Sequence, residues 1–426
     1  MNLVVLCPHF APDVAPTGDV MTRIALELVE RGHRLHVVTA LPWYQRHAIE
    51  PGWDGQLVRG EVTEWGRISR VHPFPTDKRN IPARALAFGG FTALAAAVGG
   101  VSKLRPDAVL AMSPPLTLGP AGWVVATARR VPLVFNIQDV FPDVAVELGL
   151  LQGRRAIAAA SWLERTSYRL SDAVTVLSED LADNVRTKIA AGLDEERAER
   201  EVAKVRVIPN FVDTDRIRPD DRENSYRADY GLAGKQVVMY AGNVGFSQSL
   251  DLVLLAARSF AVSRPEVVFV INGGGAARPE LEAAAADLPN VRFIDMQPAE
   301  RLPDVLAAAD VHVVPLRAGL AWSSVLSKLY SILAAGRPLV ASVDEGTEVA
   351  RTVERAGAGI SVPPDDPAAF TAAVGRLLDD PQAAAQMGAA GRRFVEGWAS
   401  PAAVAAAYES LFVELSARRG HRRSSQ

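Results

Sequence analysis

Three short segments rich in glycine and serine have the composition of anion-binding loops. Residues 242–245 and 273–275 each follow an apolar run, and residues 323–328 precede a helical pattern that ends at Gly336. Small residues let backbone N–H groups approach an anion, and a helix N-terminus adds a favourable dipole. Lys328 would add a full positive charge, which suits a diphosphate. A tight turn explains any one loop equally well, but three in succession favour a phosphate site.

Motifs of several other enzyme classes are absent. Residues 7–12 follow the first apolar run, where a dinucleotide dehydrogenase would carry G-x-G-x-x-G. Neither a P-loop nor a G-x-S-x-G elbow occurs in the sequence. The seven histidines form no H-E-x-x-H motif and no cluster with cysteine, so we expect no zinc site. We interpret the carboxylate pairs at 139–143 and 213–215 as helix-start and loop residues.

Short apolar runs alternate with amphipathic helical patterns along the whole chain. This alternation predicts parallel sheets that are covered by helices on both faces. In the first half, the expected strands are 3–6, 35–39, 108–111, 133–137, 174–177 and 205–208. In the second half, they are 237–240, 267–271, 291–294, 311–314 and 338–341. Ligands of such folds bind beyond the carboxyl ends of the strands, so function is expected in the loops that follow them.

The predicted fold class is α/β, with two doubly wound domains that face each other across a cleft. The N-terminal domain is expected to span residues 1–214 and the C-terminal domain residues 215–400. Residues 401–426 predict a helix that packs back toward the first domain, followed by a basic tail. The segments 41–55 and 65–79 are expected to be loops, and their residue pattern does not predict their conformation.

The composition narrows the class of protein. The chain has 426 residues, of which 49% are hydrophobic and 22% charged, so each domain can bury a sizeable core. Its formal net charge of −3 predicts no nucleic-acid partner. A single cysteine excludes a disulfide within the chain, and together with an N-terminus unlike a signal peptide it predicts a cytoplasmic protein. Arginine far outnumbers lysine, as in GC-rich bacterial genomes.

Several longer motifs are spread along the whole chain. They include Pro8-His9-Phe10-Ala11-Pro12 with Gly18, Arg31-Gly32-His33, Ile208-Pro209-Asn210, Tyr240-Ala241-Gly242-Asn243, Ala309-Asp310-Val311-His312 and Ala334-Ala335-Gly336-Arg337-Pro338. With these motifs the chain resembles the retaining glycosyltransferases of family 4, which have the GT-B fold. A narrower branch with amino-sugar transferases, such as L-fucosamine transferases, is most similar. Its marks are residues 113–115, 138–143, 242–248 and 327–330.

The resemblance implies a nucleotide-sugar donor, usually a UDP-sugar, held by the C-terminal domain, with the acceptor on the N-terminal side. It also implies retention of configuration and no cofactor or required metal, so protein groups must stabilise the leaving diphosphate. The residues expected to act in catalysis are Lys328, Asp139 and Gln138. The residues expected to bind the donor are Gly18, Asn243, Gly245, Gln248, Gly274, Met296, Gln297, Ser323, Ser324, Ser327 and Ser331.

The sequence departs from the family pattern at some of these positions. Ser323 and Ser331 stand where much of the family carries glutamates, and Asn243 and Gln248 stand where it often carries arginine and lysine. The narrower branch shares the asparagine and glutamine, and moves the positive charge to Lys328. The role of the two serines does not follow from the sequence.

We therefore expect a retaining transferase that moves an N-acetylated amino sugar from a UDP donor to a glycan, lipid-linked or natural-product acceptor, in bacterial polysaccharide biosynthesis. Two alternatives stay open: a nucleotide-sugar 2-epimerase of the same fold, and a non-catalytic nucleotide-sugar-binding partner protein. The segment 78–105 allows two interpretations, a core helix or a contact with the inner face of the cell membrane. Its apolar centre is flanked by Lys78, Arg79, Arg84, Lys103 and Arg105.

Overall fold

The chain folds into two compact units. The computed structural model describes all residues except 77–80, 144–145, 147–150, 152, 320–325 and 425–426. The first unit comprises Met1–Asn210 together with Val404–Gln426, and the second comprises Phe211–Ala403. The chain passes into the second unit after Asn210, whereas the sequence predicts this border after residue 214.

The first unit is built around an eight-stranded sheet with the order β3-β4-β2-β1-β5-β6-β7-β8. Neighbouring strands run parallel, except that β3 is antiparallel to β4. The strands are β1 (Asn2–Leu6), β2 (Arg34–Ala40), β3 (Val58–Thr63), β4 (Gly66–Val71), β5 (Ala108–Ser113), β6 (Leu133–Ile137), β7 (Ala173–Val176) and β8 (Val205–Val207). The helices are α1 (Pro16–Glu30), α2 (Ile81–Gly100), α3 (Leu118–Arg129), α5 (Arg154–Leu170), α6 (Glu179–Ala190), α7 (Glu195–Val202) and α16 (Pro401–Ser424).

Strand β4 lies within the segment 65–79, so the expectation of a loop there was wrong. Its apolar pattern is interrupted by arginine, yet Arg70 is fully buried. The Arg70 guanidinium pairs with Glu61 of β3 at 2.7 Å, and it also donates to the carbonyls of Phe10 (3.3 Å) and Ala11 (2.5 Å). A buried charge is tolerated when it is paired and hydrogen-bonded. These partners are distant in sequence, so hydropathy could not reveal the strand.

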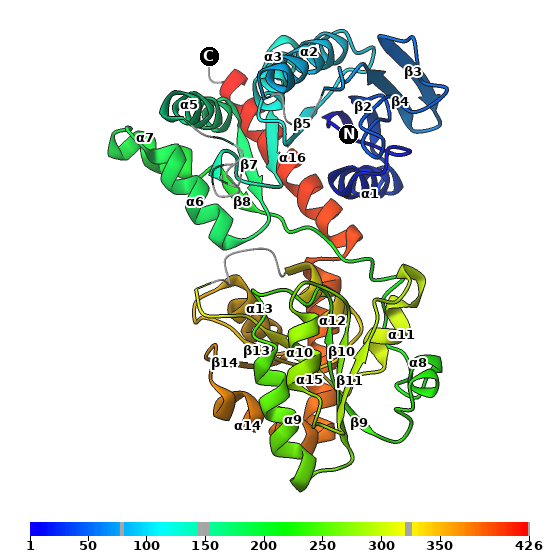
Figure 1. Cartoon of the computed structure of the whole chain (residues 1–426). Coiled ribbons are helices and arrows are strands. Elements are labelled where there is room, and N and C mark those ends of the chain that lie inside the picture. The colour runs from blue at the N-terminus through cyan, green and yellow to red at the C-terminus, as the bar shows by residue number, and fades with distance from the viewer. Residues whose placement is uncertain (77–80, 144–145, 147–150, 152, 320–325, 425–426) are drawn as a thin grey trace. The chain divides into compact units, whose positions relative to one another are not determined.

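The last helix, α16, completes the first unit. The Tyr408 side chain is buried, and its Oη accepts a hydrogen bond from Asn136 Nδ2 at 2.9 Å. Glu409 pairs with Arg31 and lies 3.0 Å from His33 Nε2. In Figure 1 this red helix runs alongside strands of the first sheet. These contacts explain why residues 404 onward belong with the N-terminal half of the chain.

The second unit holds a six-stranded parallel sheet with the order β11-β10-β9-β12-β13-β14. Its strands are β9 (Gln236–Ala241), β10 (Val267–Asn272), β11 (Val291–Ile294), β12 (Val311–Pro315), β13 (Leu339–Ser342) and β14 (Gly359–Val362). Its helices are α8 (Ser225–Asp229), α9 (Asp251–Ser263), α10 (Arg278–Ala284), the 3-10 turn η1 (Ala299–Arg301), α11 (Leu302–Ala307), α12 (Leu326–Ala334), α13 (Glu348–Ala356), α14 (Pro367–Asp379) and α15 (Pro381–Trp398). The chain thus contains two Rossmann-like α/β units, as the fold class predicts.

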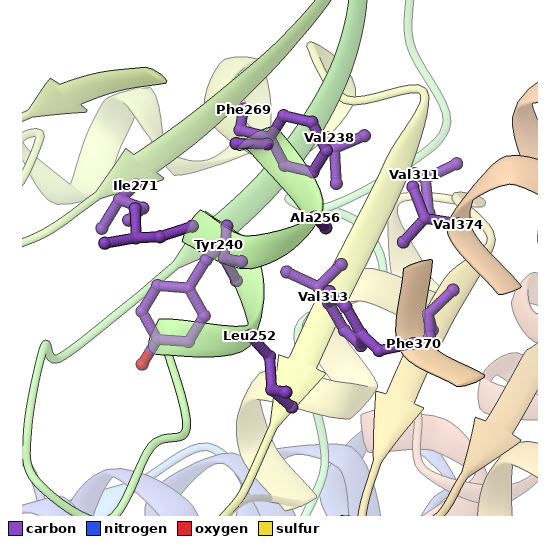
Figure 2. Packing of buried hydrophobic residues seen from close by; sticks show 14 of the residues in the cluster. Val238, Tyr240, Leu252, Ala256, Phe269, Ile271, Val311, Val313, Phe370 and Val374 are labelled. Carbon is purple, nitrogen blue, oxygen red and sulfur yellow. The ribbon is translucent and has the colours of Figure 1, made fainter. Parts of the chain in front are cut away.

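The core of the second unit lies between this sheet and the helices α9 and α14. Figure 2 shows side chains from β9, β10 and β12 packed together with Phe370 and Val374 of α14. Tyr240, the next to last residue of β9, belongs to the same cluster and pairs in register with Ile271. The strands of this core hold the loops at their carboxyl ends in place.

Two buried histidines, one in each unit, make stability depend on pH. Burial lowers the pKa of His36 and of His312 to about 4, from an ordinary value of 6.5. The unfolded chain binds more protons than the folded one between these values, so stability falls as the pH drops from 6.5 to 4. Between pH 7.5 and 5 we expect each histidine to remove about 2 kcal/mol of stability.

Urea midpoints at the two pH values test this expectation. His36 is hydrogen-bonded to Ser102 Oγ at 2.7 Å and to Ser69 Oγ at 2.9 Å, contacts that a glutamine amide can partly keep. The His36→Gln variant should therefore lose part of the acid sensitivity, whereas a change at the exposed His47 should not. Equal acid sensitivity in His36→Gln and the parent chain would contradict the assignment.

Within the described parts of the chain, no helix combines the length and the apolar character that are needed to cross a bilayer.

Candidate functional site

The strand order of the second unit brings the loops after β9 and β12 together. Strands β10 and β11 lie on one side of β9, while β12, β13 and β14 lie on the other side. The chain therefore leaves β9 and β12 in opposite directions, which creates the switch point where open α/β sheets bind ligands. The loop at residues 242–245 follows β9, and helix α12 follows β12.

Lys328, in the first turn of α12, packs directly on the loop after β9. Its Nζ donates to Tyr240 Oη at 2.8 Å and lies 4.2 Å from the centre of the Tyr240 ring. At Gly242, where φ is +146°, a Cβ atom would lie 2.6 Å from Lys328 Cε. The close approach of the lysine therefore requires glycine at this position. Burial lowers the pKa of Lys328 to about 8.

Tyr240 holds this ammonium without neutralising it. The Tyr240 hydroxyl donates to the carbonyl of Asn243 at 2.5 Å, so its lone pairs remain for the lysine. Figure 2 shows the hydroxyl pointing away from the core cluster in which the ring is packed. In the part of the chain that the structure describes, no carboxylate forms an ion pair with Lys328. A partly buried cation without a counter-charge attracts an anion strongly, because the local dielectric constant is low.

Gln248 shapes the loop after β9 from within. Its Oε1 accepts the backbone N–H of Gly245 at 3.0 Å, and its Nε2 donates to Ser247 Oγ at 2.9 Å. The Gly245 amide, an expected anion donor, is therefore engaged by Gln248 in this structure. Asn243 is the exposed polar side chain of the loop. The loop thus offers an incoming anion the exposed Asn243 amide, one residue after Gly242, against which Lys328 packs.

The glycine run 273–275 is explained first by the contact between two loops. A Cβ at Gly273 would lie 1.9 Å from the Gly242 carbonyl oxygen, and φ at Gly273 is +153°. The Gly274 carbonyl accepts the Val244 N–H at 2.8 Å. No heavy atom lies within 4 Å of a Cβ built on Gly274, so this residue is the open one of the three. The run therefore braces the loop on which Lys328 rests.

Of the remaining predicted donor residues, Gln297 and Ser331 have local hydrogen-bond partners. Gln297 Nε2 donates to Tyr230 Oη at 2.9 Å, and Met296 beside it is exposed. Ser331 Oγ donates to the Ser327 carbonyl, one turn earlier in α12, at 2.9 Å. Ser327 itself is exposed in the first turn of that helix. Ser323 and Ser324 lie outside the described residues.

In the first unit, Gln138 belongs to a buried hydrogen-bond chain. Its Nε2 donates to Asn136 Oδ1 at 2.8 Å, and its Oε1 accepts from Asn210 Nδ2 at 2.8 Å. Asn136 continues the chain to Tyr408 of α16. Both the nitrogen and the oxygen of the Gln138 amide therefore form hydrogen bonds within the first unit, and these bonds give the side chain a structural role. The expected contact of Gln138 with the reacting sugar stays a prediction.

Asp139 lies on the wall of a pocket of about 340 Å³ in the first unit, and Gly18 packs against one of the residues of that wall. Asp139 contributes to the pocket wall and is exposed, and surrounding groups that displace water raise the pKa of its carboxyl. Gly18 lies in the first turn of α1, where a Cβ would come within 2.8 Å of His9 Cβ. His9 is another residue of the pocket wall. The structure thus brings Asp139, His9 and Gly18 to one region.

Sequence reasoning assigned no role to two features of these regions. Tyr240 belongs to the motif at residues 240–243, and the only local indication of a role is its hydroxyl near the end of an aliphatic strand. The second feature is a 2.6 Å contact between His9 Nδ1 and Asp13 Oδ2. Their spacing of four residues suggests a local pair, but only the folded loop brings the two side chains together.

Two family models match the chain. The model described as "Glycosyl transferase 4-like domain" matches residues 17–210, and the one described as "Glycosyl transferases group 1" matches residues 235–380. The colanic acid biosynthesis protein of Escherichia coli K12 that is named as glycosyl transferase WcaI is 27% identical, over 89% of this chain and 92% of its own length. A GDP-mannose-dependent phosphatidylinositol monomannoside mannosyltransferase of Mycolicibacterium smegmatis is 31% identical, over 66% of this chain and 77% of its own length.

Solved structures share the fold over nearly the whole chain. Sucrose-phosphate synthase of Thermosynechococcus elongatus aligns with a TM-score of 0.63 and 20% identity, covering 98% of this chain and 99% of its own. HepE of Anabaena, solved in complex with UDP, aligns with a TM-score of 0.61 and 15% identity, covering 97% of this chain and 100% of its own.

Proposed function

Because the chain belongs to the family-4 type of glycosyltransferases, which have the GT-B fold, we propose that it transfers a sugar from a UDP-sugar to an acceptor hydroxyl with retention of anomeric configuration. The observation that carries this proposal is the Lys328 ammonium, which lies against Tyr240 at the glycine loop after β9. When the glycosidic bond to the donor breaks, negative charge develops on the departing diphosphate. A cation already in place lowers the barrier to that step.

We propose that the reaction needs no metal. A divalent cation would neutralise the diphosphate in other enzymes, and here the charge of Lys328, the Asn243 amide and the first-turn N–H groups of α12 would serve that purpose. Asp139, on the wall of the pocket in the first unit, is the proposed carboxylate on the acceptor side. Activity should therefore survive removal of divalent ions with EDTA.

The donor sugar is proposed to be an N-acetylated amino sugar. A relative from Streptomyces kanamyceticus, 30% identical over 52% of this chain, is named alpha-D-kanosaminyltransferase, which indicates an amino sugar for that enzyme. HepE of Anabaena holds UDP, which supports a UDP donor. The mannosyltransferase of Mycolicibacterium smegmatis is named for GDP-mannose, so GDP-sugars belong in the same test.

The acceptor is proposed to be a glycan, a lipid-linked sugar or a natural product, used in the cytoplasm and at the inner face of the membrane. Segment 78–105 supports membrane contact with the exposed Val101, close in sequence to the exposed Lys103 and Arg105, and with the exposed Leu86 near the start of α2. Lys78 and Arg79 lie outside the described residues, as does the side chain of Arg84. Co-sedimentation with anionic vesicles should weaken when Lys103 and Arg105 are changed to glutamine, and unchanged binding would argue against this contact.

Thermal-shift titration with UDP-, GDP- and dTDP-sugars and the free nucleotides tests the donor. A ligand that binds the native state raises the melting temperature by mass action. We expect stabilisation by a UDP-sugar and a much smaller effect in Lys328→Ala. A flat response to the whole panel would overturn the transferase proposal.

Incubation of the stabilising donor without an acceptor separates the alternatives. A 2-epimerase converts its nucleotide-sugar alone, whereas a transferase consumes it only with an acceptor or slowly with water. A non-catalytic binding partner would leave the donor unchanged in every mixture, including one with acceptor. We expect transfer that depends on acceptor.

The pKa of Lys328 predicts how donor affinity changes with pH. Lys328 is charged below pH 8 and neutral above it, so the affinity for UDP should fall as the pH rises from 7 to 9. Tyr240→Phe keeps the ring but removes the oxygen that accepts from Lys328, which lowers the pKa further. The fall in affinity should then begin at a lower pH. Calorimetric titrations with UDP at several pH values measure this shift.

Lys328→Met is the control for that experiment, because it lacks the titrating group. Its affinity for UDP should be low and should not fall further between pH 7 and 9. If Tyr240→Phe and the parent chain show the same pH profile, Tyr240 does not hold the lysine in solution.

A further inference from the structure

The pocket in the first unit lies at a switch point of its own. Strand β2 lies on one side of β1, and β5 lies on the other side. Pro8 and His9 of the loop after β1, and Pro114 and Pro115 of the loop after β5, contribute to the pocket wall. Open α/β sheets bind ligands at such points, and a volume of about 340 Å³ suits a small molecule.

Asp13 joins the loop after β1 to the loop after β2. Its Oδ1 accepts the backbone N–H groups of Trp43 at 3.2 Å and Tyr44 at 3.0 Å. Its Oδ2 contacts His9 Nδ1 at 2.6 Å, and Asp13 itself is buried. A carboxylate that accepts from Nδ1–H fixes the ring orientation and leaves the His9 Nε2 lone pair free to accept a hydrogen bond. Asp13 thus preorganises one wall of the pocket.

The rest of the wall is mainly aromatic and apolar. Trp43 and Tyr44 flank the His9 ring, with ring centres 5.8 Å and 5.1 Å away. Phe88 and Phe91 of α2 also contribute to the wall. The other polar residues of the wall are Thr17, His47, Thr76 and Asp139, and its larger part is apolar or aromatic. A ring without several hydroxyls fits that part better than a monosaccharide, whose hydroxyls would each need a polar partner.

We propose that this pocket binds an apolar ring system, aromatic or alicyclic, that carries the hydroxyl of an acceptor, and that His9 Nε2 accepts the hydrogen bond from that hydroxyl. That the occupant is an acceptor rests on the function proposed above. The binding of such a ring is independent of that function, because only residues of the first unit form the pocket. Asp13 is a positioning residue for His9 in this scheme.

Isothermal titration of the full chain with 1-naphthol, 1-methoxynaphthalene and methyl glucoside tests the proposal. Both naphthalene compounds should bind, and methyl glucoside should not. Tyr44→Ala should weaken naphthol binding by about 3- to 10-fold, through loss of an aromatic contact. Ala87→Leu, at a buried alanine on the pocket wall, should abolish binding by filling the space.

His9→Phe separates the hydrogen bond from the shape of the pocket. It keeps a flat ring but removes the accepting nitrogen, so affinity for 1-naphthol should fall by about 3- to 10-fold. Affinity for 1-methoxynaphthalene, which cannot donate a hydrogen bond, should stay the same. Trp162→Ala, at an exposed tryptophan outside the pocket wall, is the matched control and should change neither affinity.

The results distinguish this proposal from the proposed transferase function. Naphthol binding that depends on Tyr44 and Ala87, in a protein that no nucleotide-sugar stabilises, would support the pocket and overturn the transferase proposal. Stabilisation by a nucleotide-sugar without naphthol binding would support the transferase proposal and overturn the pocket assignment. Binding of methyl glucoside in place of naphthol, or naphthol binding that Tyr44→Ala and Ala87→Leu leave unchanged, would overturn the pocket assignment.

Discussion

Lys328→Ala is expected to lower kcat/KM for sugar transfer by about 10²- to 10³-fold, the loss typical when one preorganised group that stabilises developing negative charge is removed. The ammonium lies beside the loop after β9, and the described residues supply no second ammonium or guanidinium to the Tyr240 hydroxyl. The variant should still fold, because the lysine makes no ion pair with a described carboxylate. Rates with a saturating acceptor and a varied donor would measure the effect.

Thermal unfolding of the same variant provides an independent readout. Burial lowers the pKa of Lys328, which means that the folded state holds this charge at some free-energy cost. Removing it should leave the melting temperature unchanged or raise it, while activity collapses. Lys235→Ala, at an exposed lysine of the same unit, is the matched control and should retain full activity. A fully active Lys328→Ala would refute the assigned role.

Asp310→Ala is expected to destabilise the second unit by about 3–5 kcal/mol, the loss typical when one partner of a buried ion pair is removed. Asp310 Oδ2 accepts from Arg227 Nη2 at 2.6 Å and from the Val237 N–H, at the start of β9, at 2.7 Å. Arg227 is 2% exposed, and its Nε donates to the Ala308 carbonyl. The variant leaves that buried guanidinium with the exposed Glu223 carboxylate, 2.6 Å from Nη1, as its remaining ion-pair partner, and removes the acceptor of the Val237 N–H.

Urea unfolding of the full chain, monitored by a signal from the second unit, measures this change in stability. Asp287→Ala is a suitable control, because Asp287 pairs with Arg258 on the exposed surface. We expect no measurable change there, since exposed ion pairs contribute little. A similar small effect for Asp310→Ala would show that the Arg227 pair is solvated in solution. The aspartate of the 309–312 motif would then need another explanation.

The strands that the sequence missed share a physical cause. Strand β3 alternates exposed and half-buried residues at the edge of its sheet, so it has no apolar run. Strand β4 carries Arg67 and Arg70, and burial of Arg70 depends on Glu61 and on two carbonyls of another loop. Strand β14, Gly359–Val362, is short and only partly buried. Hydropathy detects apolar strands that are covered on both faces; β3 and β14 are only partly covered, and β4 is buried over 68–71 but carries a charged residue there.

The elements of the candidate site could be predicted from the sequence, whereas the contacts between them could not. The local sequence predicted the loop at 242–245, the helix that starts near Lys328 and the order of the apolar runs, because these features depend on residue type and spacing. The glycine run at 273–275 was also predicted locally, whereas the contact with Gly242 that requires glycine at Gly273 appears only in the structure. Gln138 was expected to face the reacting sugar, and this stays a prediction; the sequence did not show that its amide also bonds to Asn136 and Asn210.

Composition and hydrophobic periodicity were sufficient for two doubly wound α/β units, because a buried parallel strand is apolar whatever its neighbours are. The small residues before Lys328 also predicted a phosphate-binding role for this lysine, and that role stays a prediction. The partners of that lysine, and of His9, depended on the order of strands in each sheet. Tyr240 and Lys328 are 88 residues apart, and Asp13 reaches Trp43 across 30 residues. Such contacts form only when the sheet brings separate loops to one edge, so only the tertiary structure could reveal them.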